Sequence, residues 1–527
     1  MKIKLKTIFT IAVFIFIAGL LIAFEAQPGF PDPDSFYHAK MATVIRDQGF
    51  IETFPWFQWM DFKNVYVNPH LLYHILLIPF VTIFNPLIGI RISAVIFGLL
   101  AFLAIYLTAR SFKASHPWLY PLIAALTTGF LFRMSLPRAP SLSVAFLLLA
   151  TWAMLKQRPK ILFFTSLFFA WLYHGWPVIF LSLGAVVAAT FVAETLKKHD
   201  SVWSHFKNTY KQQKWNTIAT VTGVLAGLII NPYFPQNIQF SILDIFKIGI
   251  VNYQSILSVG QEWFPYTADG FLMACFPALL TGGLALAFFI PGLISTKKMP
   301  PSEQVVAIFT FLFLAGGYSI LCFKANRYVE YAVPFMVLET AVLSPFAWNF
   351  WIKEIWPIVQ EFLKTSRLKT MALGLLLTII FAGFAGGSVK TIIKNNEYYQ
   401  AKQYETATDW IKTHVPANET VFHNSWDYSL VLWYLDDTHY YLGGLDPTFM
   451  YDYDKTVYDL WDRLSKGEET DVEQINSVFK SRVVVIDKRF DSAGTFAENL
   501  TASGLFTKVA ENEWVEVYAD PELIQKN

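Results

Sequence analysis

Long apolar segments recur through the first 390 residues of the chain and leave little room for a water-soluble fold. The chain has 527 residues, of which 54% are hydrophobic and only 15% are charged. A helix that crosses a bilayer needs about 20 apolar residues, and several segments approach that length. The sequence therefore predicts a polytopic, mainly α-helical membrane protein. The segments lie at 7–24, 71–88, 90–109, 118–132, 139–155, 161–174, 176–193, 217–231, 271–295, 304–323, 329–350 and 371–388.

The distribution of lysine and arginine predicts how these segments are oriented. Lys2, Lys4 and Lys6 precede the first segment, and a lysine-rich stretch at 194–215 separates two later ones. Because basic residues favour the cytoplasmic side, we expect a cytoplasmic N-terminus and an extracytoplasmic C-terminal domain at the plasma (inner) membrane. The same rule gives about eleven spans if the segment at 71–88 does not cross the bilayer.

Two long loops are then expected on the outer face. The first loop (25–89) contains the non-crossing segment, which should form an apolar helix at the membrane interface. The late loop (231–270) contains an amphipathic stretch at 235–250, of a kind that lies along a membrane surface. The segment at 7–24 is read as an uncleaved span, although a signal peptide is the alternative.

The composition changes near residue 390, where the chain becomes polar and mixed in charge. The spacing at 404–414 predicts a helix, 482–487 predicts a buried strand and 514–518 an alternating strand. We therefore expect a transmembrane domain at 1–390 and a soluble α/β domain at 391–527.

Charge and cysteine content exclude two classes of function. The formal net charge is +1, so the chain has no basic surplus of the kind that binds nucleic acid. Cys275 and Cys322 both lie inside apolar segments, which argues against a disulfide framework or a thiolate metal cluster.

Two carboxylates follow the first apolar segment and are the strongest candidates for chemistry. Asp32 and Asp34 lie beside the predicted membrane surface, where acidic side chains are costly unless they have partners or a function. A carboxylate here could act as a general base or bind a divalent cation. The alternative is that Asp34 only caps a helix that begins at Phe36.

Histidines form a second candidate group in the first loop. His70 and His74 are one helical turn apart and could share a face, but two histidines without a third ligand are a weak metal signal. The pattern favours the alternative, interfacial histidines on an amphipathic helix, and His38 is ambiguous in the same way.

Basic residues at the expected outer face suggest that an anion binds there. Arg133 and Arg138 lie in one outer turn, and Arg327 lies at the outer end of two spans. A planar guanidinium suits bidentate binding of phosphate. The alternatives are that the turn arginines only extend to the interface, and that Glu330 neutralises Arg327.

Two later stretches combine acidic and aromatic residues. Glu262 lies among aromatics in the late loop, and we expect it to meet Asp34 across the outer surface. Trp426, Asp427 and Tyr428 have side chains of the kind that recognise sugars or peptides, although a tryptophan packed in the domain core is the alternative.

Together these motifs resemble the GT-C superfamily of membrane glycosyltransferases, and most closely the catalytic subunit of oligosaccharyltransferase. The family's Asp-x-x-Tyr-Tyr-His-type stretch after the first span resembles Asp-Ser-Phe-Tyr-His at 34–38. Its Ser-Val-Ser-Glu-type motif resembles Ser-Val-Gly-Gln-Glu at 258–262, with one extra residue. Its Trp-Trp-Asp-Tyr-Gly motif resembles Ser-Trp-Asp-Tyr-Ser at 425–429. The family's second acidic motif belongs near 133–141, where this chain has no carboxylate.

The resemblance implies a glycosyltransferase. Its donor would be a sugar or oligosaccharide on a polyprenyl phosphate or diphosphate, and its acceptor a glycan, lipid or protein on the outer face. The implied roles are catalysis by Asp34 and Glu262, which could share Mg²⁺ or Mn²⁺; phosphate binding by Arg327 and Arg138; acceptor binding by Trp426, Asp427 and Tyr428; and support by Asp32, His38, His70 and His74.

Other functions stay open at this point. The nearest alternative is a protein-glycosylating oligosaccharyltransferase. A lipid or solute transporter would need charges or broken spans in mid-membrane, whereas the charges here gather in the outer loops. A non-catalytic scaffold whose C-terminal domain binds partners is a third alternative.

Overall fold

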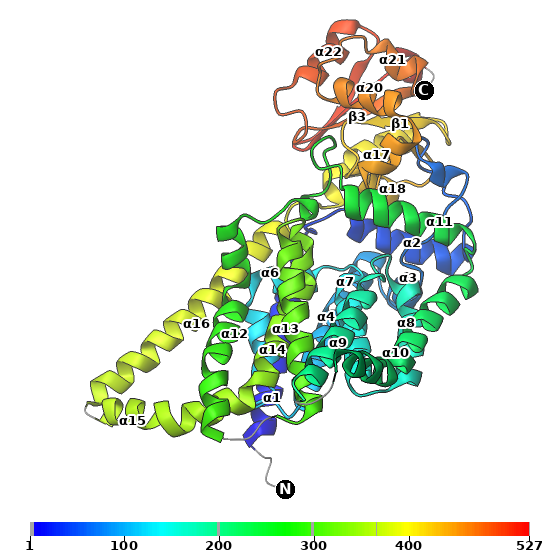
Figure 1. Cartoon of the computed structure of the whole chain (residues 1–527). Coiled ribbons are helices and arrows are strands. Elements are labelled where there is room, and N and C mark those ends of the chain that lie inside the picture. The colour runs from blue at the N-terminus through cyan, green and yellow to red at the C-terminus, as the bar shows by residue number, and fades with distance from the viewer. Residues whose placement is uncertain (1–4, 198–200, 297–299, 365, 526–527) are drawn as a thin grey trace.

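The computed structural model describes residues 5–197, 201–296, 300–364 and 366–525. It shows a helical bundle with a smaller α/β domain at one end (Figure 1). The bundle contains α1 (Leu5–Glu25), α4 (Pro86–Ser111), α5 (Leu119–Leu126), α6 (Thr128–Ser135), α7 (Pro140–Leu155), α8 (Pro159–Leu172), α9 (Val178–Thr195), α10 (Val202–Ile230), α12 (Ala268–Thr296), α13 (Ser302–Cys322), α14 (Val329–Phe350), α15 (Trp356–Lys364) and α16 (Arg367–Asn395).

Apolar helices identify the chain as an integral membrane protein. Within the described ranges, seven helices are long and apolar enough to cross a bilayer, or up to eight if the bent pair α6 and α7 is one span. The expected number was about eleven. The difference arises because α6 and α7 are short and meet at 111°, α8 has only 14 residues, and the first half of the long α10 is polar.

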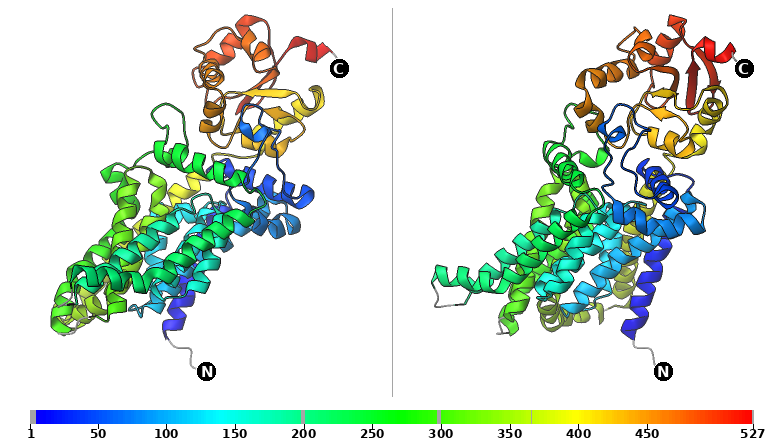
Figure 2. Two further views of the ribbon diagram at one scale, coloured as in Figure 1. Left: turned by 45° about the vertical axis from the view of Figure 1, so that its right-hand side comes forward. Right: turned by 90° about the vertical axis from the view of Figure 1, so that its right-hand side faces the viewer.

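The orientation in the membrane stays a prediction. Lys2, Lys4 and Lys198, which contribute to it, lie outside the described residues. Figure 2 shows that α1 begins at the end of the bundle far from the C-terminal domain. This arrangement agrees with the expectation that the N-terminus and the C-terminal domain lie on opposite sides.

Short elements of the two loops lie between the bundle and the C-terminal domain (Figure 1). The non-crossing segment forms α3, whose 13 residues span about 20 Å, less than the roughly 30 Å hydrocarbon core. The amphipathic stretch of the late loop forms α11, which continues as a π-helix. These elements are α2 (Asp34–Gln48), α3 (Leu71–Ile83), α11 (Gln236–Leu243), the π-helix η2 (Asp244–Val251), and the 3₁₀ turns η1 (Asp61–Lys63) and η3 (Gln261–Trp263). A further 3₁₀ turn, η4 (Asn326–Tyr328), precedes α14.

The C-terminal domain is built on a five-stranded sheet with the order β2-β1-β3-β5-β4. β1 runs parallel to β2 and β3, whereas β5 is antiparallel to β3 and β4. The predicted helix is α17, and the predicted strands are β3 and β5. The strands are β1 (Thr420–His423), β2 (Tyr440–Tyr441), β3 (Ser481–Asp487), β4 (Thr507–Glu511) and β5 (Val515–Ala519). The helices are α17 (Lys402–His414), α18 (Ser429–Leu435), α19 (Pro447–Tyr453), α20 (Lys455–Ser465), α21 (Glu473–Ser477), α22 (Thr495–Ser503) and α23 (Pro521–Gln525).

The first loop is joined to this domain by backbone hydrogen bonds and aromatic packing. The Tyr441 N–H donates to the Trp56 carbonyl over 2.7 Å, so the loop extends the edge of the sheet at β2. The fully buried Trp433 ring packs on Phe54 with centroids 4.8 Å apart. The first loop is therefore fixed between the bundle and the C-terminal domain.

The boundary predicted at residue 390 stays a prediction, and α16 continues past it to Asn395.

Candidate active site

A cavity of about 1190 Å³ lies where the bundle, the two loops and the C-terminal domain meet. Its wall includes Asp34 from the first loop, Glu262 from the late loop, and Arg327 from the turn before α14. Trp426 and Asp427 line it from the C-terminal domain. The structure thus brings together most of the residues that the sequence singled out, from segments far apart in the chain.

Asp34 is the first residue of α2, and its position follows from local sequence. Pro33 precedes the helix, and Gly49 ends it with φ of 78°, a conformation that glycine adopts without strain. The side chain that bonds back into the first turn is Asp32, which accepts from the Ser35 N–H over 3.2 Å. The capping role that was the alternative for Asp34 is therefore filled by Asp32, and the Asp34 carboxylate is left to face Arg138.

Arg138 joins the carboxylates of the two loops. One guanidinium nitrogen, Nη2, lies 2.7 Å from Oδ2 of Asp34. The other, Nη1, lies 3.3 Å from Oε2 of Glu262 and 3.8 Å from Oδ2 of Asp32. Arg138 was expected to bind a donor phosphate, but here its fork is occupied by carboxylates. Arg138 lies in the sharp turn between α6 and α7, whose bend directs it towards the cavity.

Two further arginines hold Glu262. Arg133 Nη1 lies 2.6 Å from Oε2 of Glu262, and Arg327 Nη1 lies 3.2 Å from its Oε1. The Arg327 guanidinium also stacks over Trp263, 4.3 Å from the ring centroid, and donates to the Tyr173 hydroxyl. Glu330, a suggested partner of Arg327, instead lies 2.6 Å from Arg133. We call Asp32, Asp34, Arg133, Arg138, Glu262, Arg327 and Glu330 the ion cluster.

Burial and charge act differently on the acidic groups of the ion cluster. Burial raises the pKa of Asp34 to about 7, although the adjacent Arg138 opposes this rise. Burial also raises the pKa of Asp32. Glu262 is buried as well, but Arg138, Arg327 and Arg133 outweigh burial and hold its pKa well below the usual range. The site therefore contains one firmly ionised carboxylate and one that exchanges a proton near neutral pH.

The histidines form a chain rather than a metal pair. His74 Nδ1 donates to the Asn68 side-chain oxygen over 2.9 Å, and its Nε2 accepts from His38 Nδ1 over 2.8 Å. Burial lowers the pKa of His38, His70 and His74, so these rings are neutral. His38 and His70 line the cavity, whereas His74 is fully buried. His70 and His74 share a face, as their spacing suggested, with ring centroids 6.1 Å apart, and both rings contact His38 on α2.

The donor atoms of the cavity do not fit a divalent cation. Among the residues that the structure describes, no group of three or more His, Cys, Asp or Glu side chains is arranged to hold a metal ion. Asp34 and Glu262, the two carboxylates that could share such an ion, have Arg138 between them. The turn at 133–138 contributes two guanidinium groups and no oxygen ligand from a carboxylate.

The predicted acceptor motif divides between the cavity and the protein interior. Trp426 donates its Nε1–H to the Ser258 carbonyl over 2.8 Å, which links the C-terminal domain to the late loop. Asp427 accepts from the Tyr399 hydroxyl over 2.5 Å at the cavity wall. Tyr428 is fully buried, and its hydroxyl donates to the Val485 carbonyl over 2.8 Å. Tyr428 therefore packs in the core of the domain, which does not agree with direct contact to an acceptor.

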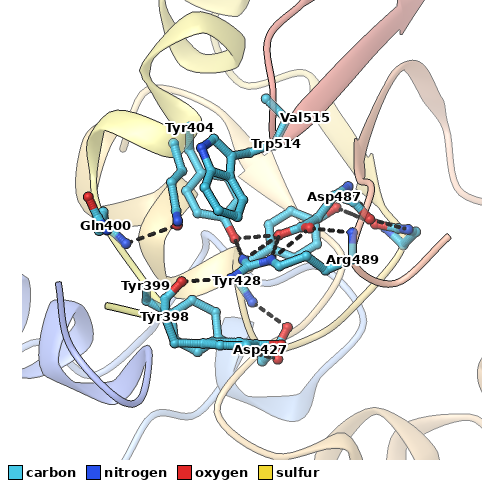
Figure 3. A network of polar contacts seen from close by, with 12 residues as sticks. Tyr398, Tyr399, Gln400, Tyr404, Asp427, Tyr428, Asp487, Arg489, Trp514 and Val515 are labelled. Atoms are coloured by element: carbon cyan, nitrogen blue, oxygen red, sulfur yellow. Dashed lines mark hydrogen bonds and ion pairs between the residues drawn. The ribbon is translucent and has the colours of Figure 1, made fainter. Parts of the chain in front are cut away.

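Figure 3 shows the polar network behind this motif. Arg489 lies 2.6 Å from the buried Asp487, which also accepts from the Tyr404 hydroxyl over 2.6 Å. The Tyr404 ring stacks on Tyr428, with centroids 5.3 Å apart. We call Tyr399, Tyr404, Asp427, Tyr428, Asp487 and Arg489 the C-terminal network.

Several cavity residues were not assigned a role from the sequence. His174 faces His70, with ring centroids 4.9 Å apart, and its Nδ1 lies 4.0 Å from Oδ1 of Asp244. Asp446 lines the wall near the start of α19. The break at His174-Gly175 between two apolar segments was one available signal, and the stretch Gly-Gly-Leu-Asp-Pro at 443–447, of a kind that recognises sugars or peptides, was another for Asp446. Asp244 has no signal beyond its charge.

Comparison with known proteins gives matches at the level of structure only. No protein-family model and no curated protein sequence matches the chain. The apo oligosaccharyltransferase of Archaeoglobus fulgidus is similar with a TM-score of 0.59 and 12% identity, over 93% of this chain and 70% of that chain.

Two other solved structures contain ligands. AglB, an oligosaccharyltransferase of Archaeoglobus fulgidus in complex with an inhibitory peptide and a dolichol-phosphate, has a TM-score of 0.56 and 12% identity, over 94% of this chain and 71% of that chain. ArnT from Cupriavidus metallidurans, bound to undecaprenyl phosphate, has a TM-score of 0.53 and 14% identity, over 97% of each chain. At these identities the likeness concerns the fold alone, and the chain has the GT-C fold of membrane glycosyltransferases.

Proposed function

We propose that the protein is a membrane glycosyltransferase that moves a sugar or oligosaccharide from a polyprenyl-phosphate or -diphosphate donor to an acceptor on the outer face of the plasma (inner) membrane. The observation that carries this proposal is the convergence of Asp34, Glu262 and Arg327 on one cavity. The dolichol-phosphate and undecaprenyl phosphate bound by the similar proteins support a lipid-linked donor.

Asp34 is the residue suited to activate the acceptor. The acceptor oxygen or nitrogen attacks the anomeric carbon, its proton passes to the Asp34 carboxylate, and the bond between that carbon and the phosphate oxygen breaks. A general base is most effective when its pKa lies near the working pH. Burial places the pKa of Asp34 at about 7, which meets this requirement.

Arg327 is the residue suited to the leaving group. The departing phosphate takes the electron pair of the broken bond, and charge-assisted hydrogen bonds from a guanidinium stabilise it. Glu262 and the Trp263 ring hold Arg327 in place at the cavity wall. His70 lines the same cavity with its buried Nδ1 unpaired in the structure, so it can give a further hydrogen bond.

A panel of donors and acceptors tests this function. The purified full chain is incubated with polyprenyl-linked sugars and with peptide, glycan or lipid acceptors, and the product is measured by mass spectrometry. We expect transfer to one acceptor class and its loss in alanine variants of Asp34, Glu262 and Arg327. Undiminished transfer in all three variants would assign the activity to another protein and favour the scaffold alternative.

A protein-glycosylating oligosaccharyltransferase is the second candidate. It is favoured by the inhibitory peptide bound to the similar AglB, and by the cavity wall formed by Trp426 and Asp427. A peptide product in the acceptor panel would select it. Movement of the labelled donor across proteoliposomes without any transfer product would instead favour a transporter.

A further inference from the structure

We propose that Arg138 is the resident cation of the transfer site and that transfer needs no divalent metal ion. In this view the guanidinium occupies the place between Asp34 and Glu262 that a bound Mg²⁺ or Mn²⁺ would otherwise take. The inference rests on the proposed function and specifies how its reacting carboxylate is held.

The first support is geometric. A guanidinium has two outward edges of N–H donors in one plane, so it can hold two carboxylates at fixed relative positions. Arg138 does this with Oδ2 of Asp34 at 2.7 Å and Oε2 of Glu262 at 3.3 Å. These carboxylates come from the two loops, so one side chain fixes both loops at the cavity.

The second support is the balance of charge. Four carboxylates of the ion cluster face three guanidinium groups, and each guanidinium lies within 3.3 Å of at least one of those carboxylates. A divalent ion between Asp34 and Glu262 would lie next to Arg138 and close to Arg133, where like charges repel strongly in a partly buried site. Arg133 and Arg138 together carry the same charge as one divalent ion.

The third support is the set of available ligands. Hard divalent cations require several oxygen ligands. The turn at 133–141, which faces the two carboxylates, has arginines at 133 and 138 and no acidic residue. No metal-binding group of three or more acidic, His or Cys side chains occurs in the described part of the chain.

Arg138 acts in this scheme as a positioning residue. It engages Oδ2 of Asp34, which leaves the other oxygen of that carboxylate to receive the acceptor proton. An arginine remains protonated at every working pH, so this alignment does not depend on the supply of a metal. A purely structural ion pair would give the same distances. It would not predict, however, that a metal ion can take the place of Arg138.

Metal binding to the full chain in detergent is the decisive measurement. Mn²⁺ is titrated by calorimetry and by thermal shift into the wild type and Arg138→Asp. Arg46→Asp is the matched control, because Arg46 pairs with Asp47 on the exposed end of α2. We expect no saturable Mn²⁺ binding in the wild type or the control below about 1 mM, and saturable binding with a raised Tm in Arg138→Asp.

Two results would overturn the inference. One is saturable Mn²⁺ binding by the wild type that Glu262→Gln abolishes. The other is an Arg138→Asp protein that elutes as the wild type in gel filtration but binds no more Mn²⁺ than Arg46→Asp. If Arg138→Asp does not fold, Arg138→Gln replaces it, with weaker but saturable Mn²⁺ binding expected because the guanidinium is gone.

Activity gives an independent readout. We expect wild-type transfer to change less than about twofold after dialysis against EDTA, and Arg138→Gln to lose about 100-fold and to regain part of it with Mn²⁺. A tenfold loss of wild-type transfer in EDTA that Mn²⁺ reverses would contradict the inference. If the wild type transfers no sugar at all, the proposed function fails, while the Mn²⁺ titrations still decide the identity of the cation.

Discussion

The ion cluster and the C-terminal network use the same residue types under different conditions. In the C-terminal network, Asp487 is fully enclosed and meets a guanidinium and a phenol. In the ion cluster, Asp34 lines the cavity with 21% of its side chain exposed, and burial of the rest raises its pKa. Enclosed pairs of this kind support the fold, whereas a carboxylate that is poorly solvated and open to a cavity is available for chemistry.

Asp34→Asn gives the largest effect expected from this comparison. The amide keeps the shape of the side chain but cannot take the proton that leaves the acceptor substrate, so transfer should fall by about 10³-fold. The Tm should change little, because Asn still accepts a hydrogen bond from Arg138. Radiolabelled-sugar transfer and intrinsic-fluorescence unfolding measure the two quantities on one preparation. Near-normal turnover in Asp34→Asn would remove this residue from the mechanism.

Asp487→Asn should show the opposite pattern. It removes the charge that balances Arg489 and presents an amide N–H₂ where two donors already point, so the C-terminal domain should lose about 3 kcal/mol of stability. Lys508→Gln is the control, since its exposed pairs with Glu511 and Glu516 contribute below about 1 kcal/mol. Turnover per folded molecule should stay near the wild-type value. A large loss of turnover at unchanged Tm would show that the two regions are not separate in function.

His423 provides a pH test of the enclosed region. Burial lowers the pKa of His423 to about 4. Its Nε2 accepts from the Leu442 N–H over 3.1 Å, so this nitrogen cannot take a proton without losing that bond. The unfolded chain binds this proton near pH 6.5, so stability is complete above pH 6.5 and is lost as the pH falls towards 4. The loss should approach about 3 kcal/mol, at 1.36 kcal/mol per pKa unit.

The matched variant isolates this contribution from other titrating groups. His423→Gln has no group that titrates in this window, so its Tm should depend less steeply on pH between 6.5 and 4 than that of the wild type. Parallel pH profiles for the two proteins would exclude His423 as the source of acid sensitivity.

The sequence predicted the elements of the fold, but only some of the contacts between side chains. The bundle, the sheet and the non-crossing α3 follow from apolar length and periodicity, which are local properties. The sequence predicted that Asp34 and Glu262 lie close together. It did not predict that Arg138 binds both, because that contact depends on the 111° bend between α6 and α7. In the same way, helical spacing placed His70 and His74 together but gave no sign of the hydrogen bond from His38.

Tyr428 illustrates a second limit. The sequence Trp-Asp-Tyr at 426–428 does not show whether the Tyr428 ring faces a ligand or the core of the domain. Only the position of β3 shows that the Tyr428 hydroxyl donates to Val485. Neighbouring residues of one motif therefore belong to different regions, with Trp426 at the cavity and Tyr428 in the interior.

Trp426 joins the two regions, and its substitution should give the smallest effect. Its Nε1–H donates to the Ser258 carbonyl, so Trp426→Phe removes one hydrogen bond between the C-terminal domain and the late loop, worth about 1 kcal/mol. Because Trp426 lines the cavity from the C-terminal domain, whereas the proton transfer is assigned to Asp34 of the first loop, we expect the acceptor KM to rise about fivefold with kcat nearly unchanged. Trp410→Phe is the control, since Trp410 stacks on His414 on α17. A fall in kcat with constant KM would show that the contact at Ser258 shapes the reacting groups themselves, because the late loop also carries Glu262.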